Sequence, residues 1–121
     1  MKTLLLILSL IFVGFSTINA QSYAISADAK KLEIAKTTGV YDFVMGADVT
    51  EEKVTEVSKY YTEYITITFD AATSKATITL VNIDEKSKMV MARFFVAIGA
   101  ENIMMGEELM SVSDYLQKYI L

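Results

Sequence analysis

The sequence predicts an α+β fold: a four-stranded antiparallel sheet with two helices on one face and an extra helix at the C-terminus. Two segments of alternating apolar and threonine residues, ITITFD and ATITLV, are separated by a short polar loop, which is typical of a hairpin with one buried and one exposed face. A segment of helical periodicity precedes this hairpin and another follows it. This arrangement indicates a sheet that is covered by helices on one side.

The first strand is predicted at residues 40–45, VYDFVM, because its side chains alternate in character with a period of two. Asp42 falls on the face that the threonines of the later hairpin also occupy, so we expect a solvent-exposed carboxylate there. The opposite, buried face carries Tyr41, Phe43 and Met45.

A first helix is predicted to begin at Asp48, since Asp48 and Glu51 have the spacing of a capping box. Apolar residues then recur at i, i+3, i+7 and i+10, a spacing that places them in one stripe along a helix. The stripe consists of Val54, Val57, Tyr61 and Tyr64.

A second helix is predicted at residues 85–98, capped by Asn82 or Asp84 and ended by Gly99 at the position that glycine favours after a helix. The elements after it are a fourth strand at 103–105, a turn at 106–108 and a last helix that begins at Ser111 or Ser113.

The resulting order, βαββαβ, resembles the ferredoxin-like fold, in which two split βαβ units interleave to give the spatial strand order 4-1-3-2. The stretch AIGAENI after the second helix is similar to the ending of the small heavy-metal-associated domains of copper chaperones. That resemblance implies a CxxC metal site in the loop after the first strand. The corresponding residues 45–51 contain no cysteine, so no binding residue of that family is carried over.

Residues 1–20 are typical of a secretory signal peptide, because Lys2 precedes an apolar stretch that gives way to small and polar residues before Ala20. We expect an exported protein, periplasmic or secreted, with no membrane span after cleavage. Residues 21–38 show no sustained period and are predicted to form an N-terminal arm with a short extended piece at 32–35. The folded domain is expected to cover residues 39–121.

The charge balance argues against nucleic acid and anionic membranes as partners. The chain has 11 basic and 15 acidic residues, and Lys2 lies in the predicted signal peptide, so the remaining chain carries 10 − 15 = −5. Nucleic acids and anionic lipids select basic surfaces. Cysteine is absent, so stability has to come from burial and not from disulfides.

The composition also argues against catalysis. The chain has no histidine and no cysteine, and therefore lacks the usual general base near neutral pH and the most nucleophilic side chain. Its carboxylates show no pattern typical of a catalytic pair. We therefore expect a protein that is not an enzyme and has no cofactor.

Methionine supplies the one alternative with a cofactor, because thioether sulfur is a soft ligand that suits Cu(I). Adjacent or alternate methionines point apart, as Met89 and Met91 do on a helix. A shared site would therefore need sulfurs from different elements, and the predicted sheet brings together Met45, Met105 and Met110. The other interpretation of these residues is adaptable core packing.

The function that the sequence favours is a small exported binding or interaction module, acting through homodimer or protein-partner contacts on its sheet face. Two residues outside the sheet are candidates for partner binding. Arg93 is the chain's only arginine, and Tyr60 lies off the apolar stripe of the first helix. Both residue types are enriched at protein interfaces.

Overall fold

The computed structural model describes residues 23–121. The predicted signal peptide at 1–20 lies outside these residues. Export, which is expected from that segment, therefore stays a prediction. Within residues 23–121, no helix is both long enough and apolar enough to cross a membrane.

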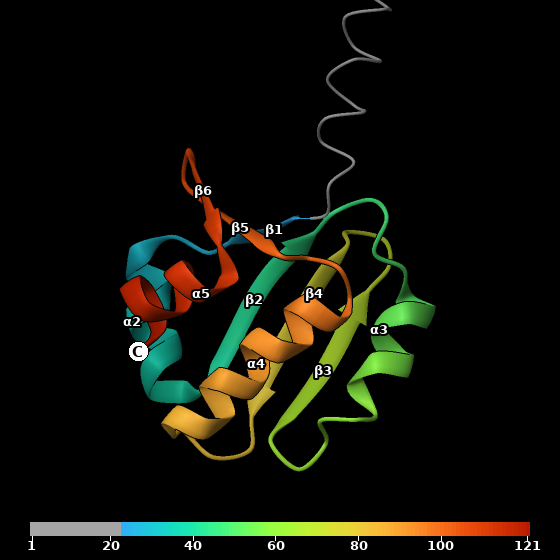
Figure 1. Cartoon of the computed structure of the whole chain (residues 1–121), viewed down its shortest axis with the longest axis horizontal. Coiled ribbons are helices and arrows are strands. Elements are labelled where there is room, and N and C mark those ends of the chain that lie inside the picture. Colours follow the sequence, from blue (N-terminus) through green and yellow to red (C-terminus); the bar gives the residue numbers. More distant parts are fainter. Residues whose placement is uncertain (1–22) are drawn as a thin grey trace, which may run out of the picture.

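The protein has an α+β fold built on one mixed sheet of six strands, in the order β3-β4-β2-β1-β5-β6 (Figure 1). Helix α4 and the C-terminal helical segment cover one face of this sheet, and α2 lies beside β2. In chain order, the elements are β1 (Tyr23–Ser26), α2 (Ala29–Thr38), β2 (Val40–Met45), α3 (Glu51–Ser58), β3 (Ile65–Asp70), β4 (Lys75–Leu80), α4 (Glu85–Ala97), β5 (Asn102–Met105), β6 (Glu108–Ser111), α5 (Val112–Tyr115) and the π-helical segment η1 (Leu116–Ile120).

The centre of the predicted sheet is confirmed. Strands β3 and β4 form the expected antiparallel hairpin, with Thr66 opposite Thr79 and Thr68 opposite Thr77. Strand β2 pairs with the other side of β4 and places Asp42 opposite Thr77, so Asp42 and the threonines share one face. Burial alternates along β2 as predicted, with Tyr41, Phe43 and Met45 inside.

The prediction of a four-stranded antiparallel sheet is wrong, because the expected N-terminal arm supplies a central strand. Tyr23–Ser26 forms β1, which pairs antiparallel with β2 and parallel with β5. It therefore separates the strands at 40–45 and 102–105, which the order 4-1-3-2 placed side by side. A strand of four residues is too short to show a period, and β1 is specified by pairing on both sides and by the complete burial of Ala24.

The extended piece expected at 32–35 is instead part of helix α2. The Asp28 side chain accepts a hydrogen bond from the Lys31 backbone N–H at 2.9 Å, which caps the helix. Gly39 ends it in the left-handed conformation, with φ 75°. Leu32 and Ala35 are buried, and this single apolar strip fixes the helix against the sheet.

Helix α3 is shorter than its apolar stripe suggested. Thr50, and not Asp48, caps it by accepting a hydrogen bond from the Lys53 N–H at 3.2 Å. The helix ends at Ser58, and the chain then turns so that the carbonyl of Tyr61 accepts the N–H of Ile65 at the start of β3. Tyr61 and Tyr64 still pack against the core, but from this turn. The apolar spacing that predicted the helix thus extends to Tyr61 and Tyr64, beyond the end of α3 at Ser58.

The C-terminal part follows the prediction except for one strand. Asp84 caps α4, and Gly99 follows it with φ 86°. The turn at 106–108 continues into an additional strand, β6, which pairs antiparallel with β5. Ser111 then caps α5 by accepting a hydrogen bond from the Asp114 N–H. Strand β6 has only four residues and, like β1, is too short to show the alternation of side chains that identifies a strand in a sequence.

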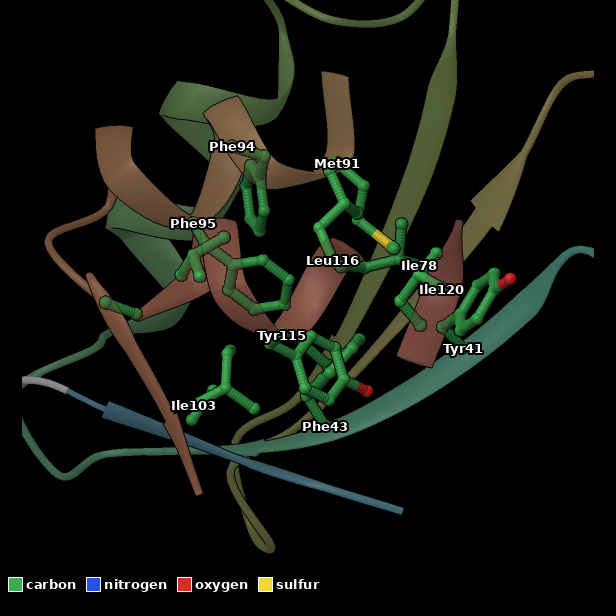
Figure 2. Close-up of a cluster of buried hydrophobic side chains, with 14 of the residues drawn as sticks. Tyr41, Phe43, Ile78, Met91, Phe94, Phe95, Ile103, Tyr115, Leu116 and Ile120 are labelled. Carbon is green, nitrogen blue, oxygen red and sulfur yellow. The ribbon is translucent and has the colours of Figure 1, made fainter. Parts of the chain in front are cut away.

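An aromatic cluster forms the middle of the core between the sheet and the helices (Figure 2). Phe43 of β2 packs edge-to-face against Phe95 of α4, with ring centroids 4.7 Å apart. The ring of Tyr115 in α5 also packs edge-to-face against Phe43, with ring centroids 6.1 Å apart. The Tyr115 hydroxyl is hydrogen-bonded to the Ser26 hydroxyl at 2.6 Å, which ties α5 to the end of β1.

The two buried tyrosines give a matched pair of predictions. Tyr41 Oη is buried without a hydrogen-bond partner among the described residues, whereas Tyr115 Oη is bonded to Ser26. Tyr41→Phe should leave the free energy of unfolding unchanged or raise it by about 1 kcal/mol, because it removes an unsatisfied buried hydroxyl. Tyr115→Phe should lower it by about 1 kcal/mol. Urea unfolding followed by circular dichroism measures both, and equal losses would contradict this account.

Stability should also fall at alkaline pH. Burial raises the pKa of Tyr115 to about 12, against 10.0 for a free tyrosine, and burial also raises the pKa of Tyr41. Below pH 10 both states are protonated, and stability is complete. Between pH 10 and 12 the unfolded chain loses a proton that the folded protein retains, so up to about 2–3 kcal/mol of stability is lost. In urea titrations at pH 9 and pH 11, Tyr115→Phe should lose less stability than the wild type. Equal losses would refute the assignment.

Candidate functional site

The face of the sheet opposite α4, called here the open face, carries a continuous line of apolar side chains, three of them exposed and one, Met104, half-buried. Cross-strand register places Val44 beside Ile25, Ile25 beside Met104 and Met104 beside Leu109, so that one line crosses β2, β1, β5 and β6. We call these four residues the apolar row. Ile25 is 42%, Val44 41% and Leu109 53% exposed. An apolar strip of this kind is typical of an interaction surface when polar residues border it.

The border on one side is the polar half of the open face, on β3 and β4. The Thr77 hydroxyl donates a hydrogen bond of 2.7 Å to the Asp42 carboxylate. Lys75, which lies opposite Val44 at the end of the apolar row, forms an ion pair with the same carboxylate at 3.7 Å. Asp42 is thus a surface residue held by two neighbours, as its place among the threonines predicted.

A shallow crevice adjoins the apolar row, where α2 lies beside the open face. Its floor is apolar and its rim carries charges of both signs. It is lined by Lys31, Leu32 and Ala35 from α2, and by Ile25, Val40, Asp42, Val44 and Lys75 from the sheet, among other residues. The apolar row of the open face is therefore bordered by this crevice on the side of α2.

The two predicted partner-binding residues lie elsewhere. Arg93 is exposed on α4, on the helical side of the molecule, where it lines a groove between α4 and α5. Tyr60 follows α3 and is 79% exposed. It does not line that groove, although its neighbour Tyr61 does. The structure therefore does not join Arg93 and Tyr60 in one site, and neither belongs to the open face.

The three methionines of the copper alternative lie on different strands. Register gives the sequence Met45, Ala24, Ile103, Met110 across the sheet, so Met45 and Met110 lie three strand spacings, or about 14 Å, apart at their Cα atoms. Strand β1 also separates Met45 from Met105. Met45 and Met110 are buried, and Met105 packs against the core. The copper alternative thus stays a prediction without a supporting contact.

Carboxylates offer no other metal site in the described part of the chain. Among residues 23–121, no group of three or more histidine, cysteine, aspartate or glutamate side chains is arranged to hold a metal ion.

Sequence reasoning found Asp42 and the threonines of the open face but missed most of the apolar row. Ile25 fell in the segment predicted as an arm, and Leu109 lay between the predicted turn and the last helix, where no element was predicted. The sequence indicated these strands only weakly. In YAIS and in ELMS, two adjacent apolar residues would point to opposite faces of a strand, the smaller or sulfur-containing one to one face and the larger to the other. Four residues do not distinguish that alternation from chance.

Comparison with protein-family models, with curated proteins and with solved structures finds no match to this chain.

Proposed function

We propose that the protein is an exported, non-enzymatic interaction module that self-associates through the open face of its sheet. The observation that carries the proposal is the apolar row. Four apolar side chains from four strands lie in one line on the face that the helices leave uncovered. Covering them removes apolar surface from water, which is the dominant favourable term in most protein association.

A second copy is the occupant that the chemistry of this face favours. In a two-fold symmetric contact, each patch meets its own equivalent, so a patch must be complementary to itself. The apolar row is uncharged and can pack against itself. The charges beside it are of both signs, with Lys31 and Lys75 positive and Asp42 and Asp70 negative. Two copies in a two-fold contact therefore do not bring together surfaces that carry charges of only one sign.

Self-association should weaken when a charge is placed in the apolar row. Ile25→Lys and Leu109→Lys should each raise the dimer dissociation constant about tenfold or more, because an unpaired charge buried in the contact costs more than ~1.4 kcal/mol. Sedimentation velocity over a concentration series gives the constant, and circular dichroism confirms that each variant is folded.

Val81→Lys is the matched control. Val81 directly follows β4 and is 51% exposed, but it lies outside both the apolar row and the crevice. It should leave the dissociation constant within about twofold. A wild-type protein that stays monomeric at the highest concentration would overturn the proposal. Folded row variants that associate as tightly as the wild type would overturn it equally.

A further inference from the structure

The groove between α4 and α5 is another apolar surface that the described residues leave uncovered, and it lies on the side opposite the open face. Along α4, Met89, Ala92, Arg93 and Val96 stand at i, i+3, i+4 and i+7, which places them in one stripe. The stripe faces Val112 and Leu116, which are buried, whereas Met89 and Val96 are exposed. An apolar floor with an exposed apolar rim indicates a place for an apolar ligand.

One cation stands in this apolar lining. Arg93 forms no ion pair or hydrogen bond with any other described residue, and the three ion pairs among those residues all use lysine. No acidic side chain among residues 23–121 lines the groove, and apart from Arg93 the lining residues with polar side-chain atoms are Ser113 and Tyr61. A guanidinium group presents its donors in a fixed fork that matches a carboxylate. The groove thus lacks the anion that would complement its single positive charge.

We propose that this groove binds a single-chain amphiphile with a carboxylate head group, such as a medium-chain fatty acid. The carboxylate lies against Arg93, and the alkyl chain covers the floor formed by Val112 and Leu116. The inference does not depend on self-association, because it uses other residues on the other side of the molecule.

The shortage of polar groups in the groove favours such a ligand over an extended peptide. A peptide brings an N–H and a C=O with every residue, and each requires a partner when it is buried. The groove is walled by helices, whose backbone groups are largely bonded within the helices. An alkyl carboxylate requires polar partners only at one end, and Arg93 supplies them.

The size of the groove fits the same class. Its volume is about 490 Å³, within the range of roughly 300–1,000 Å³ found for small-molecule sites. From Met89 to Val96 it extends seven residues along α4, or about 10 Å. This length holds a medium alkyl chain, while a long chain would extend beyond the rim into water.

The test uses sodium decanoate, below its micelle concentration, with the folded chain observed by amide nuclear magnetic resonance. We expect saturable shifts concentrated in α4 and α5. Arg93→Gln should raise the dissociation constant about tenfold or more, and Arg93→Lys should raise it less, because a charge remains. Decanol, which has the same tail and no charge, should bind the wild type at least about tenfold more weakly.

Lys118→Gln is the matched control. Lys118 is an exposed cation on the neighbouring segment η1, but it does not line the groove and is paired with Glu108. Its substitution should leave decanoate binding unchanged. Val96→Ser should weaken the binding of decanoate and decanol alike, because it removes apolar surface from the rim of the groove. No saturable binding to the folded wild type would overturn the proposal, as would equal affinity for decanol and decanoate.

Shifts that map to the open face would also overturn it. So would an Arg93→Gln variant that is folded and binds decanoate as tightly as the wild type. Sedimentation velocity on the same samples measures self-association independently of decanoate binding. None of these groove variants should change the dimer dissociation constant.

Discussion

The packing of Phe43 against Phe95 and Tyr115 holds the molecule together. These three rings come from β2, α4 and α5, and both contacts with Phe43 are edge-to-face. Such pairs contribute about 0.5–1.5 kcal/mol beyond the area that they bury. Their larger effect is to fix which face of the sheet the helices cover. Once Phe43 points inward, the alternation of β2 forces Asp42 and Val44 outward onto the open face.

The aromatic cluster also reaches β1, through the hydrogen bond between Tyr115 and Ser26. This strand has only four residues, yet it lies between β2 and β5 and pairs with both. Its insertion widens the sheet beyond the hairpin and β2. Without β1, the apolar row would lose Ile25, and Met104 and Leu109 would no longer be aligned with Val44. The fold therefore builds its candidate interaction surface with its shortest strands.

The open face and the groove between α4 and α5 differ in a way that suits different occupants. The open face offers an apolar row bordered by threonines and by charges of both signs, which allows a two-fold contact between copies. The groove between α4 and α5 is smaller, and a single arginine supplies its charge. A surface that complements itself favours self-association, whereas an apolar groove with one cation favours an amphiphile with one anion.

The sequence by itself determined the elements whose pattern is long or whose cap is local. Alternation over six residues defined β2, β3 and β4 and put Asp42 with the threonines, and neighbouring residues limited the cap of α4 to Asn82 or Asp84, of which the structure has Asp84. Tertiary structure alone decided that Tyr23–Ser26 and Glu108–Ser111 are strands, because four residues acquire that conformation from partners that complete their hydrogen bonds. It also decided the apolar row, since those four side chains are brought together only by the order of the strands in the sheet.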